Sequence, residues 1–239
     1  MGPGMDALTL VLPAWNERDV IVPVVEEALA APELDGMGIL LVDDGSTDGT
    51  GGLLDDLAAR HSRCGAMHLP HGGKDAALWA AFARVETEWV GIMDSDGQYD
   101  PRDAAKMLAM GGEGYAAIWG VRAKRHDNGW RKAISKAGRL AKRAVLGSCT
   151  VKDTGCGLWI AKTDMVRDLA ELCPRPAGQV HCHIPELIRA RGGKIGETPV
   201  AHRSRLGGHA KFGALNRLVP GFASLLQARR ALRGARHAT

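Results

Sequence analysis

The sequence predicts an α/β fold with a mostly parallel central sheet flanked by helices. Short apolar runs alternate with amphipathic stretches through the first half of the chain, which is the pattern of repeated βα units. Polar clusters follow several of these apolar runs, as expected where parallel strands end at one edge of a sheet. The 239 residues suffice for one domain with a sizeable core.

The first half of the chain contains five predicted strands. They cover residues 7–12, 38–42, 65–69, 89–93 and 115–120. Helices are predicted between them over 17–31, 48–60, 74–86 and 101–110. Asp48 and Asp100 are suitable N-cap residues, and Pro101 suits the first turn of a helix.

The second half is less regular. An amphipathic helix is predicted over 129–147, and strands are predicted over 151–161 and 194–200 on either side of a helix at 184–191. A last amphipathic stretch runs from 213 to about 233 and carries several arginines. We expect a single domain over 1–239, because no low-complexity block or linker divides the chain.

Charge is distributed unevenly along the chain. Residues 1–120 carry 7 Lys and Arg against 20 Asp and Glu, whereas residues 121–239 carry 24 against 7. An acidic half can hold a cation, and a basic half can bind phosphate or an anionic membrane surface. With few aromatic residues and no recognition motif, we expect no nucleic-acid partner.

Cysteine usage and hydropathy indicate the compartment. The five cysteines are scattered and include no CxxC pair, which is typical of reduced thiols in a cytosol. The first residues lack the regions of a signal peptide, and no apolar run approaches the about 20 residues of a membrane-spanning helix. We therefore expect a soluble or peripheral protein.

The polar clusters that follow strands predict one site. They are Asn16 and Glu17, Asp43 and Asp44, Asp94 and Asp96, and Arg122. Because the carboxyl ends of parallel strands share an edge, these clusters should converge. The oxygen ligands of the stretch DSDGQ (94–98) suit Mg²⁺ or Mn²⁺ bound together with substrate phosphates, although a polar turn is an alternative. Residues 181–183 (HCH) are a poor zinc site, since adjacent ligands rarely fit one tetrahedron.

Six motifs carry a resemblance to a known family. They are PAWNE (13–17), VDDGSTDGT (42–50), DSDGQ (94–98), GVR (120–122), DTGCGL (153–158) and HRSRLGGHAKFG (202–213). In order and spacing the chain resembles the inverting family 2 glycosyltransferases with the GT-A fold, and within them the dolichol-phosphate mannosyltransferase and undecaprenyl-phosphate glycosyltransferase group. The chain departs from that pattern at several positions: Trp15, His71, Val121, Cys182 and Ala210.

The resemblance implies roles for individual residues. The base and ribose of a nucleotide would lie against Pro13, Trp15, Glu17, Val42 and Asp44. The diphosphate and its Mg²⁺ or Mn²⁺ would be held by Asp94, Asp96 and Gln98, beside Ser95 and Arg122. Arg205 and Lys211 would be the basic pair of a loop that closes over the phosphates. Residues 7–120 would form the nucleotide-sugar half, 121–212 the acceptor half and 213–239 an amphipathic tail.

The function implied is transfer of a sugar from a UDP- or GDP-linked donor to a polyprenyl phosphate at the cytoplasmic membrane face. A phosphate acceptor is ionised at neutral pH and needs no general base. With a hydroxyl acceptor, Asp153 would be the best candidate base; with a phosphate acceptor it would orient groups instead. A non-catalytic module that binds acidic surfaces through the basic half is a third possibility. Helices 129–147 and 213–233 could lie on a membrane or pack on the domain, and the apolar tail could instead mediate a homo-oligomer.

Overall fold

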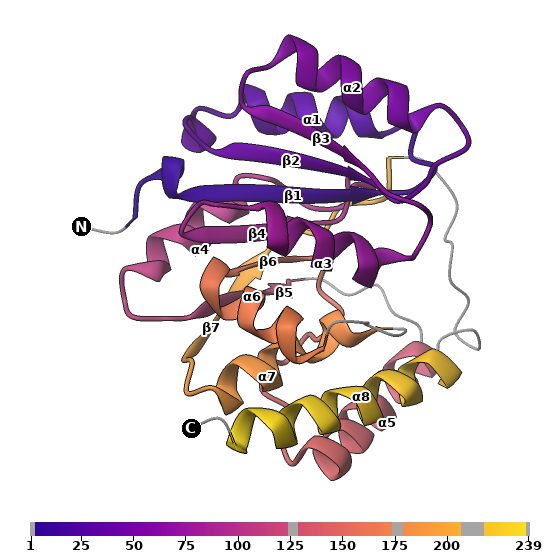
Figure 1. The fold of residues 1–239 in the computed structure, drawn as a ribbon, viewed down its shortest axis with the longest axis vertical. Coiled ribbons are helices and arrows are strands. Elements are labelled where there is room, and N and C mark those ends of the chain that lie inside the picture. The colour runs from indigo at the N-terminus through magenta and orange to yellow at the C-terminus, as the bar shows by residue number, and fades with distance from the viewer. Residues whose placement is uncertain (1–2, 124–128, 174–178, 207–217, 238–239) are drawn as a thin grey trace.

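The computed structural model describes residues 3–123, 129–173, 179–206 and 218–237. In this part of the chain one seven-stranded sheet has the order β3-β2-β1-β4-β6-β5-β7 (Figure 1). The strands are β1 (Leu8–Ala14), β2 (Gly38–Asp43), β3 (Cys64–His68), β4 (Trp89–Met93), β5 (Ala117–Arg122), β6 (Leu158–Lys162) and β7 (Ile195–Val200). Only β6 is antiparallel to its neighbours β4 and β5. The predicted mostly parallel α/β fold is therefore confirmed.

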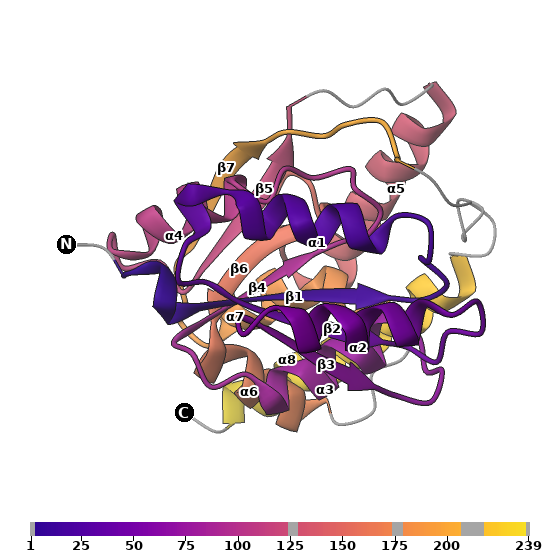
Figure 2. The same ribbon diagram turned by 90° about the horizontal axis from the view of Figure 1, so that it is seen from above.

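Helices cover both faces of this sheet. They are α1 (Ile21–Ala30), α2 (Thr50–Arg60), α3 (Lys74–Arg84), α4 (Asp103–Gly111), α5 (Gly129–Leu146), α6 (Thr163–Leu172), α7 (Ile184–Ala190) and α8 (Leu218–His237). A short 3₁₀ turn, η3 (Val180–His183), precedes α7. Helices α1 and α4 lie on one side of the sheet and α3 and α6 on the other (Figure 2).

The central strands are buried on both faces, which explains their continuous apolar runs. All five residues of β4 are buried. The β5–β6 register places Trp119 opposite Trp159, and their indole rings stack with centroids 4.6 Å apart and planes 7° apart. Such a pair contributes about 0.5–1.5 kcal/mol beyond the area it buries. Trp119 and Trp159 are both buried in the centre of the sheet.

The second half differs from the prediction at residues 151–161. Only its end, from Leu158, belongs to β6, and helix α6 follows where no helix was predicted. The preceding residues form a turn, in which the N–H of Cys156 donates to the carbonyl of Asp153 at 3.1 Å. The Asp153 carboxylate binds Arg122 at the end of β5, and residues 151–157 form no strand.

Helices α1, α2 and α4 begin later than predicted, whereas α3 begins at Lys74, as predicted. The α1 helix begins at Ile21 rather than residue 17, after Asn16 in a left-handed conformation (φ 53°). Asp48 lies just before α2, where its carboxylate accepts the N–H of Thr50 at 3.0 Å. The Asp100 carboxylate likewise accepts the N–H of Arg102 at 3.0 Å in the turn before α4, and the N-cap residue of α4 is Arg102 rather than Asp100.

The C-terminal helix α8 packs on α5, α6 and α7 (Figure 1). Its residues Leu225, Ala228 and Leu232 are buried in this contact. No helix in the described part of the chain is both long and apolar enough to cross a membrane.

Candidate active site

Two carboxylates lie at the carboxyl end of β4. Asp94 contacts the ammonium group of Lys74, the first residue of α3. Asp96 is 7% exposed, and its Oδ2 lies 2.8 Å from the guanidinium of Arg205. Its Oδ1 accepts the N–H of Gln98 at 3.1 Å. Each carboxylate of this pair therefore faces one basic side chain.

Negative charge is concentrated at this edge of the sheet. Burial raises the pKa of Asp96, and the charges of Asp94 and Glu17 raise it further, against the opposing effect of Arg205. A group whose charge is so disfavoured gains from a nearby cation. Hard oxygen ligands with excess negative charge are what Mg²⁺ or Mn²⁺ requires, so Asp94 and Asp96 fit a divalent ion.

The close packing of Asp94 depends on a glycine in DTGCGL. The N–H of Asp94 donates to the carbonyl of Gly157 at 3.1 Å. A Cβ at Gly157 would lie 2.1 Å from Asp94 Oδ2, which no real contact allows. The N–H of Gly157 in turn donates to the buried hydroxyl of Tyr99 at 2.8 Å. This glycine thus lets β6 approach the carboxylate directly.

A segment of the predicted closing loop docks beside these carboxylates. The N–H of Arg203 donates to the carbonyl of Gln98 at 2.7 Å, and the Gln98 side-chain amide donates to the carbonyl of Arg203 at 3.2 Å. The Arg203 guanidinium pairs with Glu27 at 2.8 Å and with Asp100 at 2.6 Å. These contacts hold Arg205 over Asp96. Asp100 thus binds arginines and does not face the carboxylate pair.

Arg122 and Asp153 form a bidentate ion pair. Arg122 Nε and Nη2 donate to the two carboxylate oxygens of Asp153 at 2.7 and 2.8 Å. Burial acts to lower the pKa of Arg122, but the bonds and charge of Asp153 outweigh it and raise the pKa. The Asp153 side chain is 4% exposed. Both oxygens of this carboxylate are therefore engaged by one guanidinium.

The residues predicted to cradle the base lie at the ends of β1 and β2. Pro13 pairs with Val42 in the β1–β2 register, and its carbonyl accepts the hydroxyl of Ser95 at 2.9 Å. This bond joins the base end of the site to the carboxylate pair. Trp15 stacks on the His71 ring with centroids 4.4 Å apart.

Asp44 holds the loop that leads into α3. Its carboxylate accepts the N–H groups of Gly72 and Gly73 at 2.8 and 2.9 Å. Because Lys74 is the next residue, Asp44 positions the cation that contacts Asp94. The base end and the phosphate end of the candidate site are therefore linked through one loop.

The structure brings most of the predicted site residues to one edge of the sheet. Lys211 lies outside the described residues. The sequence reasoning missed Lys74, Tyr99 and Gly157. Lys74 could have been found, because it follows the predicted strand 65–69 and begins the next helix, as the other site residues do.

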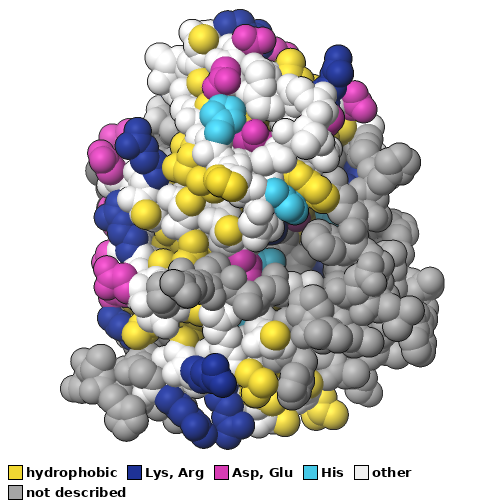
Figure 3. Space-filling view, turned by 45° about the vertical axis from the view of Figure 1, so that its right-hand side comes forward, with side chains coloured by type: hydrophobic (Ala, Val, Ile, Leu, Met, Phe, Trp, Pro, Cys, Tyr) yellow, Lys and Arg dark blue, Asp and Glu magenta, His cyan; other side chains and the backbone are white. Residues whose placement is uncertain are grey.

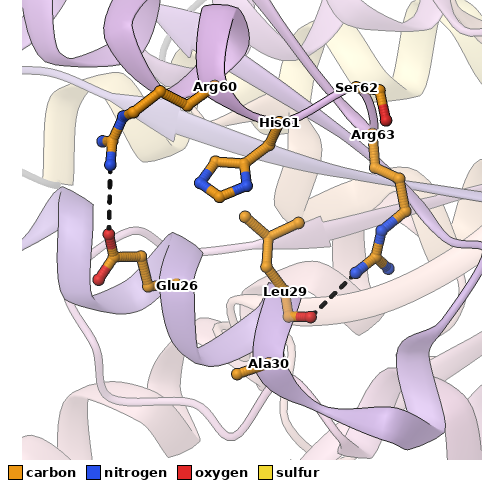
Figure 4. A pocket seen from close by; sticks show the side chains of 7 residues that line it. All are labelled: Glu26, Leu29, Ala30, Arg60, His61, Ser62 and Arg63. Atoms are coloured by element: carbon orange, nitrogen blue, oxygen red, sulfur yellow. Dashed lines mark hydrogen bonds and ion pairs between the residues drawn. The ribbon is translucent and has the colours of Figure 1, made fainter.

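Figure 3 shows the side of the molecule at which the parallel strands end. Histidine and acidic side chains are visible in the middle of this face, and basic side chains gather at the end where α8 lies. A separate hollow lies between α1 and the end of α2 (Figure 4). There Arg60 pairs with Glu26 at 3.7 Å, and Arg63 donates to the carbonyl of Leu29 at 2.9 Å. These contacts brace the two helices and include none of the site residues.

Comparison with protein families gives a match to the model of "Glycosyl transferase family 2" over residues 9–169. This range includes β1, β2, β4 and the Arg122–Asp153 pair. The chain belongs to glycosyltransferase family 2. Its curated relatives include the undecaprenyl-phosphate 4-deoxy-4-formamido-L-arabinose transferases of Enterobacter sp. (strain 638), 30% identical over 86% of this chain, and Shewanella sediminis (strain HAW-EB3), 28% identical over 89%. The chain spans 62% and 63% of these relatives.

Solved glycosyltransferases share the fold of this family 2 member. A mannosyltransferase from Pyrobaculum calidifontis, in complex with GDP-Man and Mn²⁺, superposes with a TM-score of 0.65 at 20% identity, covering 97% of this chain and 69% of its own. Glucosyl-3-phosphoglycerate synthase from Mycobacterium tuberculosis, in complex with UDP, gives 0.67 at 22% identity, covering 96% and 86%. The expected GT-A glycosyltransferase fold is thereby confirmed.

Proposed function

We propose that this family 2 member is a metal-dependent inverting glycosyltransferase that moves a sugar from a UDP- or GDP-linked donor to a polyprenyl phosphate. The observation that carries the proposal is the carboxylate pair Asp94 and Asp96, placed beside Lys74 and Arg205 at the edge where the parallel strands end. The names of the curated relatives support the acceptor class.

A divalent cation would be held by Asp94 and Asp96 together with the donor diphosphate. Within the described ranges no group of three or more His, Cys, Asp or Glu side chains could hold a metal ion, and Mg²⁺ is commonly bound by one or two carboxylates plus substrate phosphates. Such an ion supplies charge that stabilises the leaving diphosphate. The side-chain amide N–H of Gln98 donates to the Arg203 carbonyl. A role for Gln98 as a metal ligand stays a prediction.

The basic side chains bind and orient the donor phosphates. Lys74 and Arg205 place positive charge where the leaving diphosphate develops negative charge, which is the most effective position for electrostatic stabilisation. Trp15, stacked on His71, offers an aromatic surface for the base. The donor would thus extend from Trp15, along the ends of β1 and β4, to the carboxylate pair.

The hydrogen bonds between Asp153 and Arg122 favour a phosphate acceptor over a hydroxyl acceptor. A general base needs a free oxygen within hydrogen-bond reach of the attacking group, yet both Asp153 oxygens bind Arg122. A phosphate acceptor, already ionised at neutral pH, needs no such base. The Arg122–Asp153 pair then keeps a partly exposed cation beside the site.

We further propose that the protein acts as a peripheral protein at the cytoplasmic face of an anionic membrane. Leu140 of α5 is 69% exposed and Leu226 of α8 is 39% exposed. Exposed arginines accompany them: Arg143, Arg229, Arg230 and Arg233. Apolar side chains among basic residues suit a membrane interface with anionic lipids.

The test of this function is a transfer assay. Purified protein would be incubated with Mn²⁺ or Mg²⁺, undecaprenyl phosphate and a panel of UDP- and GDP-sugars, and the lipid extract analysed for a glycolipid. We expect one donor to give product, and Asp96→Ala to remove it. A lack of product with every donor, beside a working control enzyme, would refute the proposal.

A hydroxyl acceptor is the second candidate, because the solved neighbours include a synthase crystallised with UDP-glucose and phosphoglyceric acid. The variant Asp153→Asn separates the two. A base function predicts near-complete loss of transfer with donor binding retained, whereas the ion pair predicts partial loss together with lower stability. Donor binding by calorimetry and a melting curve, measured on the same preparation, distinguish these outcomes.

The third candidate is a non-catalytic module that binds acidic surfaces. It predicts that nucleoside diphosphates with Mn²⁺ leave the melting temperature unchanged and that Asp96→Ala does not alter binding to anionic vesicles. A melting temperature that rises with UDP or GDP and Mn²⁺, and not in Asp96→Ala, would exclude it.

A further inference from the structure

The coil that follows β7 runs beside α1 (Figure 2). Its residues 202–206, which we call the docked segment, pair with the polar stretch after β4. His202 forms an antiparallel bridge with Tyr99, and the two rings meet edge to face with centroids 5.3 Å apart. The N–H of Leu206 donates to the carbonyl of Asp96 at 3.4 Å. The docked segment is thus joined to this stretch at both of its ends.

A cluster of four charged side chains anchors the docked segment to α1. Arg203 Nη1 donates to both carboxylate oxygens of Glu27 at 2.8 and 2.9 Å, and its Nη2 donates to Asp100 Oδ2 at 2.6 Å. Arg102 donates to the same two carboxylates at 3.2 and 3.1 Å. Two arginines therefore share two carboxylates. Networks of this kind hold a geometry better than a single exposed ion pair does.

Glu27 belongs to none of the six sequence motifs, and it lies 176 residues from Arg203 in the chain. Consecutive side chains of a helix point about 100° apart. The neighbouring Glu26 accordingly points to α2, where its carboxylate lies 3.7 Å from Arg60. Helix α1 thus carries two adjacent glutamates, of which only Glu27 contacts the docked segment.

The anchor lies next to a basic side chain of the candidate site. Arg205 is two residues beyond Arg203, and its guanidinium lies 2.8 Å from Asp96 Oδ2. A long arginine side chain loses rotamer freedom when it binds a ligand. An anchored backbone removes part of that loss before the ligand arrives. Arg203 therefore prepares the guanidinium of Arg205 for an anionic group beside Asp96.

We propose that Arg203, anchored by Glu27 and Asp100, is a positioning residue that holds Arg205 ready for the donor diphosphate, and that α1 thereby contributes to donor binding. This inference rests on the proposed function, because its ligand is the diphosphate of the nucleotide donor. The Arg203 guanidinium is occupied by its two carboxylates and acts through Arg205. Hydrogen bonds from arginine to phosphate depend on geometry, so a displaced backbone weakens them while the charge of Arg205 stays the same.

Calorimetry of UDP and GDP with Mn²⁺ measures this contribution. The cost of ordering one long side chain corresponds to up to about tenfold in affinity, and Arg203→Met should weaken binding by that factor. Glu27→Gln should weaken it roughly threefold, because Asp100 still holds Arg203. The matched control Glu26→Gln should bind like the wild type. Unchanged affinity in Arg203→Met, or equal losses in Glu27→Gln and Glu26→Gln, would overturn the proposal.

A double replacement separates positioning from a general loss of structure. If Arg203 acts through Arg205, adding Arg203→Met to Arg205→Met should change the affinity by less than about twofold. A merely structural role predicts instead that the two losses multiply. Arg203→Lys keeps the charge without the planar fork of donors, so it should restore only part of the affinity. Full additivity in the double variant would refute the positioning role.

Hydrogen exchange measures the anchor without a ligand. The N–H groups of Arg203 and Leu206 are hydrogen-bonded, so the peptide that covers them should exchange slowly in the wild type. It should exchange equally slowly in Glu26→Gln and faster in Glu27→Gln and Arg203→Met. Equal exchange in all four proteins would contradict the anchor.

The wild type distinguishes failure of this inference from failure of the proposed function. If it binds neither UDP nor GDP with Mn²⁺, the proposed function fails and the diphosphate role of Arg205 fails with it. Hydrogen exchange then still decides whether Glu27 and Arg203 anchor the docked segment. If the wild type binds a nucleotide and Arg203→Met binds it equally well, the positioning role alone is refuted.

Discussion

The replacement Gly157→Ala tests whether the position of Asp94 controls donor binding. The added Cβ would lie 2.1 Å from Asp94 Oδ2 and 2.4 Å from its Cγ. To reach an ordinary contact the carboxylate must move by roughly 1.3 Å, since contacts shorter than 3.4 Å are tight. Crowding a packed site in this way costs about 1–3 kcal/mol of stability. A displacement of about 1 Å at a reacting centre can reduce a rate about 100-fold.

The assay compares Gly157→Ala with Gly155→Ala from the same motif. A Cβ at Gly155 meets Arg122 at 3.6 Å, an ordinary contact, so this control should behave like the wild type. Thermal denaturation measures stability, and the rise in melting temperature caused by UDP or GDP with Mn²⁺ reports donor binding. For Gly157→Ala we expect a folded protein with a reduced nucleotide shift and roughly 100-fold slower transfer. Full nucleotide shift and near-normal transfer in Gly157→Ala, or equal losses in both variants, would refute this reasoning.

Three further predictions follow from single contacts. Lys74→Met removes the cation beside Asp94 and should lower the free energy of unfolding by about 1–3 kcal/mol in metal-free buffer; an unchanged urea midpoint would contradict this. His183 is buried and its pKa is lowered to about 3, mainly by burial and then by Lys142. Its folded pKa lies below the unfolded value, so stability should fall, by up to about 1.4 kcal/mol per pH unit, as the pH drops below about 6.5. His183→Gln should flatten that dependence in melting curves, and identical slopes would argue against it. Trp15→Ala should weaken UDP or GDP binding about tenfold in calorimetry, through a lost stacking contact, and unchanged affinity would remove Trp15 from the base site.

Much of the fold could be predicted because hydrophobic periodicity is a local property. The predicted strand 89–93 and the structure's β4 have the same bounds, and the predicted helix 129–147 corresponds to α5. The exceptions are residues 151–157 and α6. Residues 151–157 have the apolar pattern of a strand, but here the ion pair of Asp153 with Arg122 outweighs the local β-propensity.

The site could be predicted only in outline. The rule that ligands bind at the carboxyl ends of parallel strands points to Asp94, Asp96 and Arg122. It does not reveal that each meets an opposite charge: Lys74 lies 20 residues from Asp94, and Asp153 lies 31 from Arg122. Those pairings depend on how close the side chains come, which no spacing rule specifies.

The sequence by itself determined the α/β class, the strands of the first half and the polar clusters after them, because these follow from the period of apolar residues and from chain length. Only the tertiary structure decided that β6 runs antiparallel between β4 and β5 and that Gly157 lies against Asp94. Strand order and side-chain contacts arise from packing between distant segments, and burial then sets the charge state of each group through its neighbours.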